Sequence, residues 1–171
     1  MIPLKYHLHP LPSGWIGLLA GDKGLRRASL KPTPQEVMED LGADADGAES
    51  DPEHFADIVA RFVRYSGGDL SALDDIELDL EDAPPFFRAA WDACRTIPPG
   101  ETRSYRWLAA EAGSPQALRA AGQAMARNRF TLIIPCHRVI SSDGGLGGYG
   151  GGGLGVKARL LQMELEQAGN S

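Results

Sequence analysis

The sequence has no apolar run that approaches the roughly 20 residues needed to cross a bilayer. Its first residues, MIPLKYHLHPLPSG, lack the apolar core of a secretory signal peptide. Cysteine is scarce, with Cys94 and Cys136 alone among 171 residues. Scarce cysteine indicates a reducing compartment and free thiols. The sequence does not exclude a disulfide bond between Cys94 and Cys136. We therefore expect a cytoplasmic protein that does not enter a membrane.

Metal-binding patterns are missing as well. The chain has no CxxC pair and no cluster of His and Cys, so a structural zinc site is not expected. His7 and His9 alternate along a predicted strand and share one face of it, and we interpret them as surface residues rather than ligands. No metal or other cofactor is predicted.

Charge is distributed unevenly along the chain. The formal net charge of -6 argues against a polyanionic partner. Residues 95–138, however, hold seven arginines against two glutamates, a local balance of +5, whereas residues 1–94 hold eight Lys/Arg against eighteen Asp/Glu, a balance of -10. Such a basic segment indicates either a surface that attracts nucleic acid or a solvated helix face.

Residues 1–83 predict a small domain of strands followed by helix. The segments 4–9, 14–21 and 24–30 carry strand patterns separated by turn signals, which predicts an antiparallel meander. The acidic stretch GADADGAES at 42–50 is expected to be a loop. Asp51 and Pro52 then cap a helix that ends at Gly67-Gly68. Its apolar stripe consists of Phe55, Ile58, Val59, Phe62 and Val63.

A second domain is expected over 84–171, after the break at Ala83-Pro84-Pro85. The stripe of its first helix includes Cys94, which we interpret as a core thiol without chemistry. Ser104 is predicted to cap a helix over 105–112, and Ser114-Pro115 to start another over 116–128. Two helices joined by a tight turn indicate a helix-turn-helix. The expected class is thus α+β, with the helix-turn-helix in the mostly helical C-terminal domain.

The second helix of that pair is rich in alanine and glycine, with Arg119 standing among the small residues. Small side chains suit a tightly packed contact between helices. They equally suit a helix whose backbone must come close to an external partner. The helix pattern does not decide between the two.

Cys136 lies in the motif IIPCHRVI, next to His137. A free thiol has a pKa near 8.5, about 1.5 units above neutrality, so a nucleophilic cysteine needs a base or a positive field nearby. Adjacent residues of a strand point to opposite faces, and a water molecule could link the two side chains. A carboxylate to orient the histidine could come from the last helix, where Glu164 and Glu166 are the candidates. Without further context, a structural cysteine or a cysteine hydrolase also fits.

IIPCHRVI, preceded by RAAGQAMARN and GETRSYRWLAAEAG, resembles the O6-alkylguanine-DNA alkyltransferases, also called methylated-DNA–protein-cysteine methyltransferases. The resemblance is close over residues 86–164 and looser before them, where the family has a small ribonuclease-H-like α/β domain. It implies DNA repair by direct reversal, in which one protein molecule accepts one alkyl group from O6 of guanine, with O4 of thymine as a second potential donor. It implies a monomer that needs double-stranded DNA and no obligate protein partner.

The resemblance also assigns residues by position. The catalytic group comprises the acceptor Cys136, the base His137, its carboxylate partner Glu164 and the hydrogen-bond donor Tyr105. The DNA-binding group comprises Arg119, which replaces the flipped nucleotide in the base stack, with Ser104, Ala120 and Arg127. The substrate-binding group comprises Asn128, Val139, Tyr149 and Gly150.

Base flipping through a minor groove only about 6 Å wide accounts for the small residues around Arg119. In this interpretation the basic segment contacts phosphates. One departure from the family is Arg129, where a proline usually follows the asparagine; this adds a cation that we expect to face DNA. The glycine-rich run after Tyr149 is also one residue longer than usual.

Two other classes of function compete with this one. A non-enzymatic module that recognises alkylated bases would share the fold, but such relatives replace the cysteine. A cysteine hydrolase or redox sensor leaves Arg119 and the paired helices unexplained.

Overall fold

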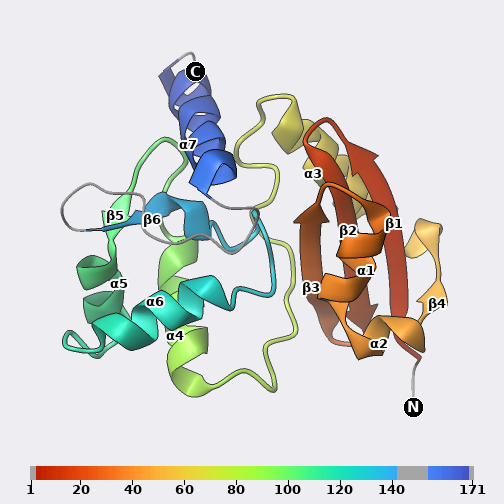
Figure 1. Ribbon diagram of the computed structural model, residues 1–171, viewed down its shortest axis with the longest axis horizontal. Helices are drawn as coiled ribbons and strands as arrows, with labels where there is room; N and C mark the ends of the chain where they lie inside the picture. Colours follow the sequence, from red (N-terminus) through yellow and green to blue (C-terminus); the bar gives the residue numbers. More distant parts are fainter. Residues whose placement is uncertain (1–2, 142–153, 170–171) are drawn as a thin grey trace. The chain divides into compact units, whose positions relative to one another are not determined.

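The computed structural model describes residues 3–141 and 154–169, and the chain divides into two compact units, Met1–Leu80 and Glu81–Ser171 (Figure 1). Our sequence-based boundary lies three residues further along, between 83 and 84. The structure is a mixed α/β protein with a sheet and several helices. Within the described ranges, no helix has the length and apolar character needed to cross a bilayer.

The first unit is built on a four-stranded sheet with the order β3-β2-β1-β4. Strands β1 (Lys5–Leu11), β2 (Gly14–Gly21) and β3 (Gly24–Lys31) form the predicted antiparallel meander. The short β4 (Glu49–Ser50) pairs with β1 in parallel. The strand patterns of the sequence therefore predicted the three long strands correctly.

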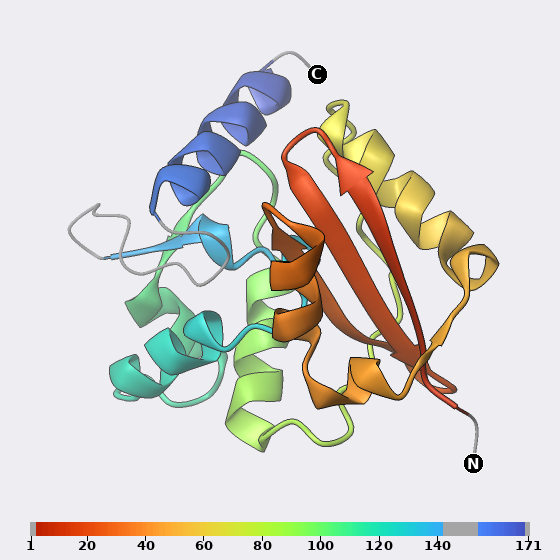
Figure 2. The same cartoon turned by 45° about the vertical axis from the view of Figure 1, so that its right-hand side comes forward.

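Both faces of this sheet are covered by helix (Figure 2). Helix α1 (Pro34–Leu41) packs on one face, where Val37 and Leu41 form a core with Leu19. The 3-10 turn η1 (Pro52–Phe55) and helix α3 (Ala56–Ser66) contact β1. His7 stacks on Phe55 with ring centroids 6.5 Å apart. Residues at both odd and even positions of β2 are buried. This central strand is therefore a continuous apolar segment that is covered on both faces.

Two local predictions for this unit were wrong. The acidic stretch 42–50 is not all loop, since it contains helix α2 (Ala43–Asp46) and β4. Ala45 is buried in the α1 core, and the Glu49 amide donates to the Leu4 carbonyl at 2.8 Å, so tertiary contacts override the polar composition. Val63 is 49% exposed, whereas Tyr65 is buried. The buried face of α3 thus runs through Phe62 and Tyr65.

The second unit contains helices α4 (Pro85–Arg95), α5 (Tyr105–Glu111), α6 (Leu118–Ala126) and α7 (Leu154–Gly169). Helices α4, α5 and α6 pack against one another. Trp91 of α4 is fully buried, and its indole donates to the Ala124 carbonyl of α6 at 2.8 Å. The strands β5 (Arg103–Ser104) and β6 (Val139–Ile140) form a short parallel pair.

Helix α6 begins later than the sequence predicted. Ser114 and Pro115 do not start it; they form a separate turn in which the Ala117 amide donates to the Ser114 carbonyl at 2.9 Å. Proline is favoured at the second position of such turns. Ala117 has a non-helical backbone and provides no side-chain cap, so the first residue of α6 is Leu118.

Candidate active site

Cys136 lies at the start of a short 3-10 helix, η2 (Cys136–Arg138), rather than in the extended chain that we expected. Its amide donates to the Ile134 carbonyl at 2.7 Å, which tightens the turn. The cysteine is 6% exposed. Because adjacent residues of a helical turn do not point to opposite faces, Cys136 and His137 share this buried region.

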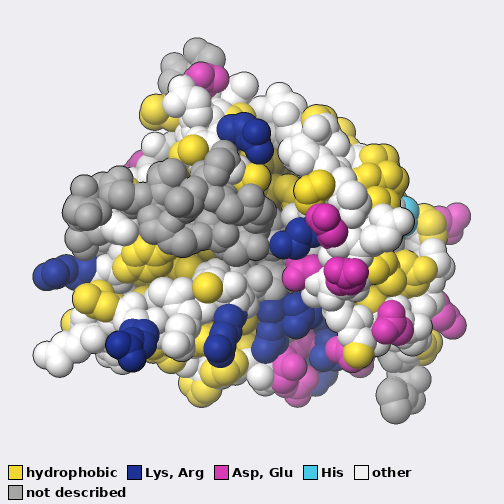
Figure 3. Space-filling model, in the orientation of Figure 1, with side chains coloured by type: hydrophobic (Ala, Val, Ile, Leu, Met, Phe, Trp, Pro, Cys, Tyr) yellow, Lys and Arg dark blue, Asp and Glu magenta, His cyan; other side chains and the backbone are white. Residues whose placement is uncertain are grey.

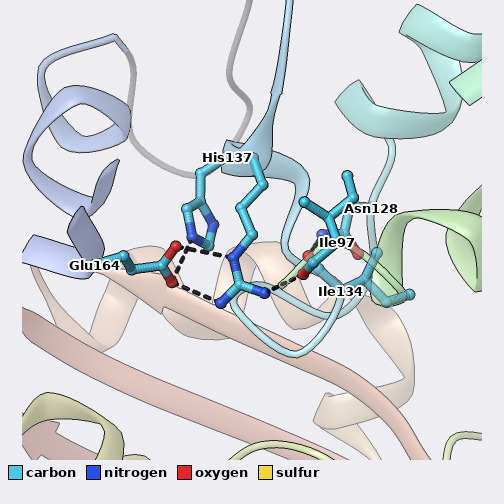
Figure 4. Close-up of polar contacts among 6 residues, drawn as sticks. Ile97, Asn128, Ile134, His137 and Glu164 are labelled. Atoms are coloured by element: carbon cyan, nitrogen blue, oxygen red, sulfur yellow. Dashed lines mark hydrogen bonds and ion pairs between the residues drawn. The ribbon is translucent and has the colours of Figure 1, made fainter. Parts of the chain in front are cut away.

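Asn128, just after α6, holds this turn in place (Figure 4). Its side-chain amide donates to the Ile134 carbonyl at 2.8 Å and to the Cys136 sulfur at 3.3 Å. Its side-chain oxygen accepts from the Phe130 amide at 2.8 Å. One side chain therefore fixes both ends of the segment 130–136.

Glu164 of α7 reaches the same turn (Figure 4). One of its oxygens, Oε2, lies 2.9 Å from Nε2 of His137. Arg138 donates to both carboxylate oxygens, from Nε to Oε1 at 2.8 Å and from Nη2 to Oε2 at 2.7 Å. All three side chains are buried. Glu166, the other candidate, is exposed and accepts a hydrogen bond from Gln162.

The burial of these groups sets their protonation. Burial alone would raise the pKa of Glu164, but hydrogen bonds from Arg138 and His137 outweigh it and hold that pKa well below its ordinary value. Burial lowers the pKa of His137 despite the facing carboxylate, so the imidazole is neutral at pH 7. Nδ1 of His137 is buried and has no hydrogen-bond partner among the described residues.

The thiol of Cys136 is protonated at rest. Burial raises its pKa, and the hydrogen bond from Asn128 offsets part of that rise. A protonated thiol reacts slowly, so the site needs a base to form the thiolate. Nδ1 of the neighbouring His137, which has no partner among the described residues, is a base of the right kind.

Tyr105 is brought to this region by the pairing of β5 with β6, in which Ser104 lies opposite Ile140. Burial raises the pKa of Tyr105, so its hydroxyl stays protonated and able to donate. Lys157 of α7 is fully buried; its ammonium donates to the Val139 carbonyl at 2.7 Å and lies 5.9 Å from the Tyr105 ring centroid. Val139 itself is fully buried.

Helix α6 presents small residues in two directions. Ala121 and Ala124 are buried, which fits the tight helix contact considered above. Gly122 and Ala126 lie on the outer side, and a Cβ added at Gly122 would meet no atom within 4 Å. The interior packing and the outward small surface are therefore both present.

The arginines of the second unit are not all available to a ligand. Arg119 and Arg127 are exposed, and neither forms an ion pair within the parts of the chain that the structure describes. Lys and Arg side chains are spaced over the α5–α6 region in Figure 3. Arg138, in contrast, is buried against Glu164, and Arg103 pairs with Glu101 at 2.9 Å. The basic segment thus supplies fewer free cations than its composition indicated.

Arg129 does not point away as a free cation, contrary to our expectation. Its guanidinium pairs with Asp82 at 2.8 Å and lies 5.6 Å from the centroid of the Trp91 ring. The residue that stands in place of a proline therefore attaches the end of α6 to the start of this unit and to α4.

The remaining assigned residues differ in how far the structure describes them. Ser104 caps α5 by accepting from the Trp107 amide at 3.0 Å, and Ala120 is half-buried on α6. Tyr149 and Gly150 lie outside the described residues, as does most of the glycine-rich run. Within residues 3–141 and 154–169, no three His, Cys, Asp or Glu side chains gather in a way that could hold a metal ion.

Sequence reasoning gave no role to Arg138 and Lys157, both of which are buried beside Cys136. A signal for Lys157 was present, because it precedes Glu164 by seven residues, and residues at that spacing share one face of a helix. Two charged residues on the buried face of one helix indicate paired or catalytic groups.

The fold and site define a protein with one buried cysteine held beside a histidine–carboxylate–arginine cluster. Residues 85–166 match the family model described as 6-O-methylguanine DNA methyltransferase, DNA binding domain. The methylated-DNA–protein-cysteine methyltransferase of Methanosarcina barkeri is 36% identical over 161 residues, or 94% of this chain and 97% of that protein. The one from Mycolicibacterium paratuberculosis is 46% identical over 118 residues, or 69% of this chain and 70% of that protein.

Solved structures agree with these relatives. The crystal structure of Mycobacterium tuberculosis OGT in complex with DNA has a TM-score of 0.80 and 35% identity, covering 95% of this chain and 94% of that one. The M. tuberculosis O6-methylguanine methyltransferase has a TM-score of 0.77 and 33% identity, covering 96% and 94%. The chain belongs to the methylated-DNA–protein-cysteine methyltransferase family.

Proposed function

We propose that this protein repairs DNA by transferring an alkyl group, typically methyl, from O6 of guanine to the sulfur of Cys136. The observation that carries the proposal is the buried assembly of Cys136, His137 and Glu164 on η2 and α7. The names of the relatives support it, since they describe cysteine methyltransferases that act on methylated DNA.

The proposed chemistry conserves atoms and charge. His137 takes the thiol proton through a bridging water, and the sulfur then attacks the alkyl carbon. The sulfur–carbon bond forms as the carbon–O6 bond breaks, and the electron pair of that bond goes to oxygen. Tyr105 donates a proton to the guanine ring as negative charge develops there, and the imidazolium restores the tyrosine. The product thioether is stable, so each molecule acts once.

The finer fold and the DNA contacts belong to the same proposal. We assign the first unit to the ribonuclease-H-like class and the pair α5–α6 to the helix-turn-helix class. Helix α6 would enter the minor groove, with Ala120 and the outward Gly122 allowing close approach to the backbone of the duplex. Arg127 and Ser104 would contact phosphates, while Asn128, Val139, Tyr149 and Gly150 would line the pocket for the flipped base.

Intact-mass analysis tests the transfer directly. After incubation with duplex DNA containing O6-methylguanine, the protein should gain the mass of one methyl group in place of one hydrogen, and peptide mapping should locate it on Cys136. The stoichiometry should approach one. Tight binding of the lesion without any adduct would contradict the transfer and identify a lesion-recognition module instead.

Arg119→Ala is expected to slow repair of duplex DNA by at least about tenfold, because each 1.4 kcal/mol lost in extruding the base costs that factor. Reaction with free O6-methylguanine base should change little, since no stack has to be opened. Single-turnover rates on both substrates measure this. Arg159→Ala, which removes an exposed arginine of α7, is the charge-matched control. An equal loss on both substrates would remove Arg119 from base flipping.

A further inference from the structure

The guanidinium of Arg138 binds both oxygens of the Glu164 carboxylate. Its Nε and Nη2 atoms bind one oxygen each, at 2.8 and 2.7 Å, and its Nη1 donates to the Ile97 carbonyl at 2.8 Å. Such a bidentate fork fixes the plane of a carboxylate as well as its charge. The Oε2 atom that faces Nε2 of His137 is therefore held in position by Arg138.

The charges of this buried cluster balance when His137 is neutral. Glu164 contributes one negative charge and Arg138 one positive charge, and the imidazole contributes none. If Arg138 were absent, the carboxylate would lose this positive charge while it stayed in contact with the imidazole. A buried negative charge favours protonation of a neighbouring histidine, by roughly 1–3 pKa units. An imidazolium has no lone pair with which to accept a proton.

Among the described residues, three other titratable groups and Lys157 lie near His137 and do not take the part of Arg138. Lys157, from α7, is a cation that disfavours the imidazolium, and its ammonium donates to the Val139 carbonyl. Cys136 of η2, Cys94 of α4 and Tyr105 of α5 are neutral at pH 7, because burial raises the pKa of each. Arg138 is a counter-charge that binds Glu164 directly.

This arrangement determines which ring nitrogen of His137 carries the proton. An ionised carboxylate at 2.9 Å accepts from Nε2, so the proton of the neutral ring resides there. Nδ1 is left as the acceptor, and it is the buried nitrogen without a partner in the described residues.

We propose that Arg138 is a positioning residue that keeps His137 neutral and protonated on Nε2, so that Nδ1 can accept the proton of Cys136. This inference rests on the proposed transfer reaction. Arg138 touches neither the sulfur nor the alkyl group in this scheme; it acts through Glu164.

The pH dependence of single-turnover transfer tests this role. In Arg138→Met the acidic limb of the rate profile should move up by about 1–3 pH units, and at pH values on that limb the rate should fall about tenfold for each unit. Arg138→Lys keeps the positive charge but not the pair of parallel hydrogen bonds to Glu164. The acidic limb of the rate profile should therefore stay in place while the maximal rate falls. Arg159→Met is the matched surface control. A uniform loss at every pH would show a merely structural role and overturn the proposal.

The double variant Arg138→Met/Glu164→Gln keeps the test possible if the single variant Arg138→Met does not fold. Removing both charges of a buried pair is tolerated far better than removing one. Its acidic limb should return to the wild-type position or below, because the carboxylate that favours the imidazolium is gone. A limb that stays at high pH in the double variant would contradict the proposal.

Nitrogen-15 NMR of the His137 ring separates this inference from the proposed reaction, because it needs no substrate. The wild type should show a neutral ring with the proton on Nε2 at pH 7, and in Arg138→Met the ring should become an imidazolium at a higher pH than in the wild type. The same ring titration in both proteins would overturn the role of Arg138 even if Cys136 accepts the alkyl group. Absence of any adduct on wild-type Cys136 would instead refute the transfer itself.

Discussion

Cys136→Ala is expected to abolish alkyl transfer while leaving the affinity for duplex DNA unchanged. The sulfur is the acceptor, and alanine provides no atom that could form the new bond. The proposed DNA-binding residues lie on α6, at its C-cap and at the N-cap of α5, whereas the hydrogen bond to the sulfur comes from Asn128. Mass spectrometry after incubation with the methylated duplex, combined with a binding titration, measures both quantities.

The second cysteine provides the control for this experiment. Cys94 is also fully buried, on α4, and burial raises its pKa well above the ordinary value. Unlike Cys136, it has no histidine beside it in the chain. Cys94→Ala should therefore retain transfer with a stoichiometry near one. An adduct that persists in Cys136→Ala and disappears in Cys94→Ala would reassign the acceptor.

Glu164→Gln is expected to destabilise the second unit by about 3–5 kcal/mol, the typical cost of removing one partner from a buried ion pair. The substitution removes the carboxylate that pairs with the buried guanidinium of Arg138. Glu166→Gln, on the same helix, is the matched control, because that side chain is exposed. Its effect on stability should remain within about 0.5 kcal/mol. Denaturant unfolding of the three proteins measures the difference, and equal stability of the two variants would contradict it.

The stabilisation from Glu164 also has a defined pH dependence. Its pKa is lowered in the folded protein, so its contribution is fully present above the unfolded value of about 4.3 and is lost as the pH falls below that value towards the folded one. The wild type should therefore lose stability on acidification through this range. Glu164→Gln should lack this part of the acid dependence, and unfolding curves recorded at pH 7 and below 4 reveal it.

The periodicity of the sequence predicted the elements whose contacts are local. Turn signals separate the three strands of the meander, and the caps at Asp51 and Ser104 are as expected, with Asp51 accepting from the His54 amide. The stretch 42–50 was mispredicted because its structure depends on Ala45 reaching a core assembled from distant residues. The start of α6 was mispredicted because Ser114-Pro115 fits a turn as well as it fits a helix.

The site was predictable in part, for a similar reason. Cys136 and His137 are neighbours in the chain, so the motif identifies them together. Glu164 lies 27 residues beyond His137, and local pattern left it equal to Glu166; burial distinguishes them. Arg138 was counted with the basic segment, because sequence alone does not show that an arginine turns inward to a carboxylate.

The near-complete burial of Cys136 has a consequence for the lifetime of the unreacted protein. Under the proposed function each molecule acts once, so it has to survive among small electrophiles and oxidants until its substrate arrives. A thiol that is 6% exposed and protonated presents little thiolate to dissolved molecules. We therefore expect the thiol of Cys136 to react slowly with dissolved electrophiles. It then remains available for an alkyl group that a bound substrate carries into the site.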